Sequence, residues 1–141
     1  MKHKFFITLS KKQLAIILAV IVIALIFSAQ RLSQNLRKID GSTNEKRIEY
    51  LKSINLVADD SNVTSKDITV PQEFGEVYNQ YNSLQKKAGF DLSRYKGKPA
   101  TVYTYSLSGT DRLIHLIICN DEIIGGDIAD ANINGSMQPL F

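Results

Sequence analysis

The feature that most constrains this chain is an uncharged apolar run from Leu14 to Ala29, in which Ser28 is the only polar side chain. As a helix the run would extend about 24 Å, against about 30 Å for the hydrocarbon core of a bilayer. It fits either an uncleaved anchor or the core of a cleaved signal peptide. Cutting after Ala29 or Ser28 would put Phe27 or Ile26 where cleavage needs a small residue, so we expect a transmembrane anchor over residues 14–29.

Basic residues flank the run unequally. Four lysines precede it, whereas the basic residues close to its other end are the three dispersed residues Arg31, Arg37 and Lys38. This asymmetry predicts a cytoplasmic basic tail over residues 1–13, a single pass, and a C-terminal part outside the cytoplasmic membrane. After the run the chain has 13 Lys and Arg residues and 14 Asp and Glu residues. The net charge of +3 therefore belongs to the tail, which argues against nucleic acid as a partner.

After the run we expect a stalk over residues 30–42 and one small domain over residues 43–141, which is a single-domain length. Ser42 to Glu45 fits a capping box with Ser42 as the cap, and it predicts a helix from Thr43 to Ile54. Asp59 to Asn62 reads as a turn or mobile loop. Asp67 to Val70 is the next strand candidate.

A second helix is predicted from Glu73 to Ala88, with Gly89 placed to end it. Its apolar residues recur at spacings of three and four, which indicates one buried face. The tyrosines in this face could be read as a binding stripe, but helical spacing favours a core role. The residues of the predicted face are Phe74, Val77, Tyr78, Tyr81, Leu84 and Ala88.

From Pro99 onward the pattern changes to β-structure. Arg112 to Asn120 is apolar on both faces and is typical of a central strand. Asn120-Asp121 predicts a tight turn, and Asn134-Gly135 predicts a hairpin turn. We therefore expect an α+β fold, with two helices packed on an antiparallel sheet of about four or five strands.

Several motifs resemble a bacterial family known as domain of unknown function family 4830. They are VYNQYNSLQKKAGFDLSRYKGK at residues 77–98, Tyr103-Thr104-Tyr105, Ile123 to Asp127, and Asn134 to Met137 with Leu140. The resemblance covers about residues 43–141 and implies an N-terminally anchored, exported protein of the bacterial cell envelope. Asn55-Leu56 stands where the family suggests a Gly-Trp pair. The family implies no activity, so no catalytic residues carry over.

Two sets of residues are candidates for interaction. Five positive charges gather within 13 residues around Tyr95, and they could bind phosphate head groups, a wall polymer or an acidic partner. A solvated helix end is the alternative. Gly125-Gly126-Asp127 could form a ligand-binding edge, although we expect a bulge in which Asp127 caps a backbone N–H. The basic set is Lys86, Lys87, Arg94, Lys96 and Lys98.

The sequence contains no catalytic constellation. His115 is the only histidine in the expected domain, so we expect no metal, no cofactor and no enzyme, and we expect His115 to be a partly buried, hydrogen-bonded strand residue. Cys119 is the only cysteine, and it reads as a small apolar strand residue. The leading hypothesis is a non-catalytic binding or protein-interaction module of the cell envelope. Its expected partners are the lipid bilayer through residues 14–29 and another envelope protein or a wall polymer.

Two alternatives stay open. One is an exported hydrolase that uses His115 with a nearby Asp as its base. The other is a structural subunit of an envelope assembly, in which the stalk and first helix mediate oligomerisation.

Overall fold

The computed structural model describes residues 10–35, 38–132 and 135–141 and divides the chain into two compact units, Met1–Lys38 and Ile39–Phe141. The first unit contains one helix, α1 (Lys11–Asn35), which includes the apolar run. Large apolar side chains along it are exposed, among them Ile16, Val20 and Leu25. Among the residues that the structure describes, no helix combines the length and hydropathy needed to cross a membrane.

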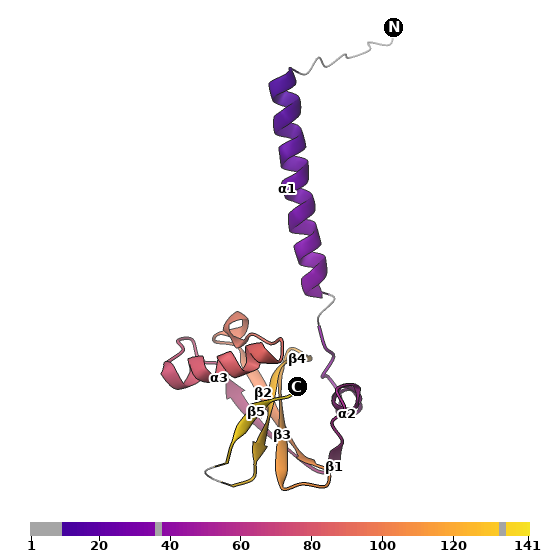
Figure 1. The fold of residues 1–141 in the computed structure, drawn as a ribbon, viewed down its shortest axis with the longest axis vertical. Coiled ribbons are helices and arrows are strands. Elements are labelled where there is room, and N and C mark those ends of the chain that lie inside the picture. Colours follow the sequence, from indigo (N-terminus) through magenta and orange to yellow (C-terminus); the bar gives the residue numbers. More distant parts are fainter. Residues whose placement is uncertain (1–9, 36–37, 133–134) are drawn as a thin grey trace. The chain divides into compact units, whose positions relative to one another are not determined.

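The second unit is built on a five-stranded antiparallel sheet with the strand order β1-β2-β3-β4-β5 (Figure 1). Together with three helices this makes an α+β fold, as expected. The central strand is β3, which is apolar on both faces in the sequence and nearly all buried toward its end. The strands are β1 (Ala58–Thr69), β2 (Pro99–Leu107), β3 (Arg112–Cys119), β4 (Glu122–Asp130) and β5 (Met137–Pro139). The remaining elements are α2 (Asn44–Ser53), α3 (Glu76–Lys87) and the short 3-10 helix η1 (Leu92–Tyr95).

The two faces of the sheet carry separate cores, because successive strand residues point to opposite sides. On one face, α2 packs through Leu51 against Tyr105 and Leu116. On the other face, α3 and η1 cover Ile117 and Ile124. Figure 1 shows α2 and α3 on opposite sides of the sheet. The sheet is therefore the middle layer of three.

The first strand is longer than expected. Residues 59–62, which we expected to be a turn or loop, belong to β1, and the prediction was wrong. The pairing of β1 with β2 shifts register between Asp59 and Thr64. Such an irregularity accommodates polar, turn-favouring residues within an edge strand, which explains the sequence pattern. The expected strand from Asp67 forms the regular end of β1.

Both helix starts differ from the prediction. Thr43, not Ser42, caps α2 by accepting the Lys46 N–H at 3.3 Å. The Ser42 hydroxyl is already engaged, because it donates to Asp40 Oδ1 at 2.6 Å. The other helix, α3, begins only at Glu76, with Gly75 as its N-cap.

The far end of α3 follows the prediction, but its buried face does not. Gly89 adopts φ 77° and ends the helix, and the Phe90 N–H donates to the Gln85 carbonyl in a Schellman arrangement. Val77, which we assigned to the apolar face, is 81% exposed, so that assignment was wrong. The buried line instead includes the polar residues Asn82 and Gln85. Helical spacing alone could not reveal buried polar side chains, because it places only the apolar ones.

The β3–β4 turn matches its sequence signature. Asn120 and Asp121 have φ values of 49° and 63° in the β3–β4 turn, as a type I′ hairpin requires. The bulge that we expected near Gly125 is present, because Ile117 pairs with Gly125 and Ile118 pairs with Ile123, which leaves Ile124 as the extra residue of β4. Asn134 lies outside the described residues. Asn55 has φ 62°, a conformation that glycine favours and asparagine tolerates.

Candidate functional site

The α2 face of the sheet carries a buried positive charge. Arg47 lies in the first turns of α2 and is only 5% exposed. Its Nε donates to Tyr105 Oη at 2.7 Å, its Nη1 donates to the Gly41 carbonyl at 2.8 Å, and its guanidinium lies 3.6 Å from the Tyr103 ring centroid. In the described part of the chain no carboxylate forms an ion pair with it. A buried charge without a counter-ion is costly and calls for a functional explanation.

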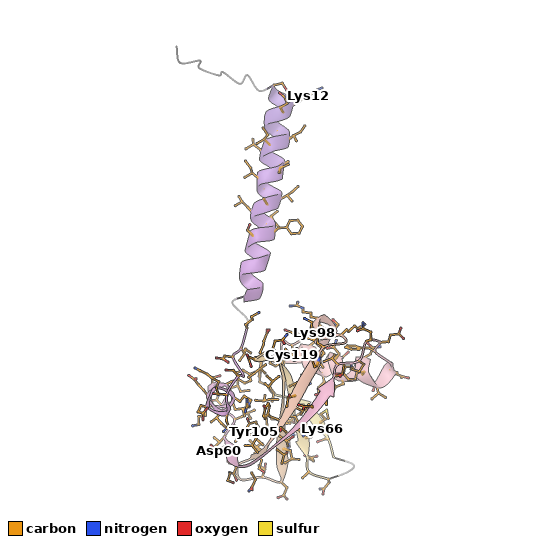
Figure 2. The ribbon with its side chains drawn as sticks, turned by 180° about the vertical axis from the view of Figure 1, so that it is seen from behind. Lys12, Asp60, Lys66, Lys98, Tyr105 and Cys119 are labelled. Atoms are coloured by element: carbon orange, nitrogen blue, oxygen red, sulfur yellow. The ribbon has the colours of Figure 1, made fainter. Side chains whose placement is uncertain are left out.

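Tyr105 holds the guanidinium in place from the sheet. This residue is fully buried on β2, beside α2 (Figure 2). Burial raises the pKa of Tyr105, although the Arg47 guanidinium acts in the opposite direction. The phenol therefore keeps its proton, and it donates to Asn44 Oδ1 at 3.0 Å. Arg47 is thus fixed by a chain of hydrogen bonds that joins α2 to β2.

Arg47 lines an open groove of about 670 Å³ beside α2. The ends of β1, β2 and β3 form one wall, and the segment before α2 and the β3–β4 turn form the others. Asp67 and Asp121 are exposed at this groove, and Tyr103 is half-buried in it. The lining residues are Gly41, Ser42, Arg47, Asp67, Ile68, Thr69, Pro99, Ala100, Thr101, Tyr103, Ile118, Asn120 and Asp121.

The segment before α2 closes one side of this groove. The Gly41 N–H donates to the Asp121 carbonyl at 2.8 Å, and Asp40 pairs with Glu122 in an isolated β-bridge. A Cβ at Gly41 would lie 2.7 Å from Ile118 Cδ1 and 2.8 Å from Ile123 Cγ1. Only glycine lets the backbone come this close, so the sequence break at Gly41 serves packing against the sheet.

The α3 face carries a polar cluster of a different kind. His115 on β3 and Asp127 on β4 are direct cross-strand partners. His115 Nδ1 lies 2.8 Å from Asp127 Oδ1, and Tyr81 of α3 donates its hydroxyl to Asp127 Oδ2 at 2.7 Å. Burial and the Asp127 carboxylate both raise the pKa of Tyr81. His115 is thus partly buried and hydrogen-bonded, as expected.

Asp127 itself has a different role from the one we predicted. It is 2% exposed, and its two carboxylate oxygens contact the side chains of His115 and Tyr81. The predicted cap of a backbone N–H was therefore wrong. The sequence could not reveal the contact with Tyr81, which lies 46 residues away, whereas a pair of His115 with a nearby Asp was among the alternatives.

The two glycines before Asp127 allow close packing on both sides of β4. Gln85 Oε1 accepts the Gly126 N–H at 2.8 Å. A Cβ at Gly125 would lie 2.9 Å from Gln85 Oε1, and one at Gly126 would lie 2.7 Å from Leu140 Cδ1. Both glycines are buried. The Gly-Gly-Asp motif therefore lies beneath α3 and η1 and does not form an exposed, ligand-binding edge.

The predicted basic set lies on the exposed end of α3, on η1 and on the loop that follows. Lys86 pairs with Asp91 at 3.8 Å, Lys96 Nζ lies 4.7 Å from the Phe74 ring centroid, and Lys98 Nζ lies 5.5 Å from that of Tyr95. Burial and Glu122, which accepts the Tyr95 hydroxyl at 3.2 Å, raise the pKa of Tyr95 to about 12. The basic set and the buried Gly-Gly-Asp motif therefore do not form one surface.

Cys119 and a second groove lie outside the clusters described so far. Cys119 is 2% exposed, and burial raises the pKa of its thiol; it lies at the same end of the sheet as Lys98, opposite Asp60 (Figure 2). A second groove of about 510 Å³, mostly apolar, lies between α3 and Met137 and includes Tyr81. In residues 10–35, 38–132 and 135–141, no group of three or more His, Cys, Asp and Glu side chains could hold a metal ion.

Sequence reasoning missed the Arg47 groove. Arg47 stands among Glu45, Lys46 and Glu49 in a polar stretch, but it lies four residues before the buried Leu51 and therefore on the same face of the helix. One available clue was the spacing of Tyr103 and Tyr105, which places two aromatic side chains on one face of a strand.

The comparisons with known proteins identify a family but no activity. No curated protein and no solved structure matches the chain. A family model described as "Domain of unknown function (DUF4830)" matches residues 47–128, more than half of the chain. The match begins at Arg47 and includes Tyr81, His115 and Asp127. The chain therefore belongs to the DUF4830 family, as its sequence motifs led us to expect.

Proposed function

We propose that this protein is a membrane-anchored binding module whose α+β domain works outside the cytoplasmic membrane and catalyses no reaction. The observation that carries the proposal is the buried Arg47 guanidinium at an open groove. Its charge is held rigidly but lacks a carboxylate partner among the described residues. A ligand or partner that supplies the missing counter-charge would compensate the cost of burying it.

The anchoring part rests on the apolar run. A helix that is apolar on all sides needs an apolar environment, and α1 exposes large apolar side chains such as Ile17, Ile21 and Phe27. Its one polar residue in the run, Ser28, donates to the Ala24 carbonyl at 2.8 Å, which leaves no hydroxyl donor for the surroundings to satisfy. The run is short, so anchoring requires local thinning of the bilayer or lysines that reach its interface.

One labelling experiment tests both location and binding. Asn62 and Thr101 are each replaced by Cys; Asn62 is exposed on β1 and Thr101 lines the groove. A membrane-impermeant maleimide should label Asn62→Cys in intact cells, because the domain is outside. The same reagent should label Thr101→Cys at least about fivefold more slowly in cells than in the purified chain, because a bound occupant protects the groove.

The outcomes separate the two parts of the proposal. Protection of Asn62→Cys from the reagent until the cells are broken would contradict the external location. Equal labelling of Thr101→Cys in cells and after purification would contradict the binding function. The buried Cys119 thiol, with its raised pKa, gives little background in either sample.

The exported hydrolase is a second candidate, supported by the contact between His115 and Asp127. A carboxylate that orients an imidazole is the usual arrangement of a general base. Replacing His115 by Gln decides between the readings. Loss of a measured turnover with unchanged unfolding would support the enzyme, whereas loss of stability without any turnover in the parent chain would support a structural role.

A further inference from the structure

Resting on the proposed binding function, we infer that the Arg47 groove binds a small zwitterion of the amino-acid class, either a free amino acid or a short peptide. The ligand carboxylate faces Arg47, and the ligand ammonium faces Asp67 and Asp121. The groove volume of about 670 Å³ lies within the range of about 300–1,000 Å³ that is typical of small-molecule sites.

Arg47 is prepared to receive a carboxylate. A guanidinium has five N–H donors in a planar fork, and the contacts to Tyr105 and Gly41 use two of them, the Nε–H and one Nη1–H. The Tyr103 ring, 3.6 Å away, fixes the plane of the fork. The remaining donors are rigid and largely desolvated, so a bound carboxylate gains strong hydrogen bonds at little entropic cost.

The rest of the groove favours a cation. Asp67 and Asp121 are the other charged residues that line it. Thr101 donates its hydroxyl to Asp67 Oδ1 at 2.8 Å, which orients that carboxylate. Two acidic residues in the same groove repel a ligand that is purely anionic, such as a phosphate polymer, and complement one that carries both charges.

The turn that carries Asp121 supports this assignment. Asp121 has φ 63°, at a position where a type I′ turn prefers glycine. A side chain in this conformation costs about 1 kcal/mol. Asp121 keeps a carboxylate at the groove at the expense of turn stability, and its replacement by Gly removes the charge without endangering the fold.

Calorimetric titration of the full chain in lipid nanodiscs tests the inference with probes that differ by one charge. The probes are alanine, alanyl-alanine, N-acetyl-alanyl-alanine and alanyl-alanine amide. We expect alanyl-alanine or alanine to bind, and whichever is tighter identifies the free amino acid or the peptide as the source. Each blocked peptide, N-acetylated or amidated, loses one charge-assisted contact. If the peptide is the ligand, both blocked peptides should therefore bind at least about tenfold more weakly than alanyl-alanine. If free alanine is the ligand, neither blocked peptide should bind.

Variants assign each charge to its residue. Asp121→Gly should weaken alanyl-alanine several-fold without weakening the N-acetyl probe, which has no ammonium. Arg47→Lys should weaken alanyl-alanine without weakening the amide probe. Equal binding of all the peptide probes would overturn the inference. So would a titration in which alanine and alanyl-alanine both fail to bind. Groove protection in cells together with such a result would leave the binding function intact and exclude only the amino-acid ligand.

Discussion

The two faces of the sheet treat their buried charged groups in opposite ways, although Gln85 Nε2 beneath α3 has no hydrogen-bond partner among the described residues. Beneath α3, the Asp127 carboxylate has a partner for each oxygen, and Gln85 Oε1 accepts a backbone N–H. Beside α2, the Arg47 guanidinium is equally buried but has no carboxylate partner in the described chain. A groove beside α3, between that helix and Met137, is mostly apolar, whereas the groove on the α2 face is lined by charged residues. The buried Asp127 carboxylate beneath α3 serves the fold, whereas the buried Arg47 guanidinium beside α2 is available to a ligand.

The largest effect is expected from opening the closed face. Replacing Asp127 by Ala leaves the Tyr81 hydroxyl and the His115 ring without their acceptor, which should lower the free energy of unfolding by about 3 kcal/mol. Urea unfolding followed by circular dichroism measures the loss. Asp127→Asn is the control, because it keeps the shape and one acceptor, and it should cost less. A loss below about 1 kcal/mol for Asp127→Ala would show that this cluster does not hold the face.

Overpacking the same face should have the next largest effect. Gly125→Ala would place a methyl group 2.9 Å from Gln85 Oε1 and 3.2 Å from Leu92 Cδ2. The expected loss is about 2 kcal/mol, because Gln85 must move away from the sheet. Gly75→Ala is the matched control, since nothing lies within 4 Å of a Cβ there. Equal unfolding midpoints for the two variants would argue against tight packing under α3.

Removing the charge from the open face should cost less than opening the closed one. Arg47→Met loses the bonds to Tyr105 and Gly41 but no longer buries an unpaired charge, so we expect a net loss of about 1 kcal/mol. The same urea titration measures it. A loss larger than that of Asp127→Ala would mean that Arg47 is mainly structural, and the contrast between the faces would disappear.

Relaxing the turn at the groove should stabilise the domain. Asp121→Gly removes a side chain from a position with φ 63°, and we expect a gain of about 0.5–1 kcal/mol. Thermal unfolding followed by circular dichroism measures the gain. Gly109→Ala is the opposite test at φ 78°, and it should destabilise. A loss of stability in Asp121→Gly would show that the carboxylate itself supports the turn.

The smallest effect concerns pH on the α3 face. Burial acts to raise the pKa of Asp91, but hydrogen bonds from Ser93 and Asn82 outweigh it and lower the pKa. A lowered folded-state pKa adds stability above the unfolded pKa, which is lost as pH falls through the folded value. Asp91→Asn should therefore flatten the decline of stability below about pH 4. Parallel profiles for the parent and the variant would show no such linkage.

The sequence predicted those parts of the fold that depend on neighbouring residues. Helical spacing located both helices of the second unit, and turn chemistry located Gly89 and Asn120-Asp121. The central strand was evident from its apolar residues on both faces. These features are local, because propensity and turn geometry act over a few residues.

The site depended on contacts that no local pattern carries. Arg47 meets Tyr105, 58 positions further along the chain, and its helical spacing from Leu51 does not reveal this partner. Gln85 was hidden in the same way on α3. The irregular first half of β1 was also missed, because residues 60–63, which have no partner in β2, form an irregularity within the strand and do not end it.

Chemical-shift mapping by NMR tests the contrast between the two faces most directly. The isotope-labelled full chain in nanodiscs is titrated with alanine or alanyl-alanine, whichever binds more tightly, and the Arg47 Nε–H resonance is followed together with the backbone amides. We predict that the shifts concentrate at Arg47, Thr101 and Asp121 on the α2 face. Shifts centred on His115 and Asp127 instead would contradict the assignment of the ligand to the open face and would favour a site beneath α3.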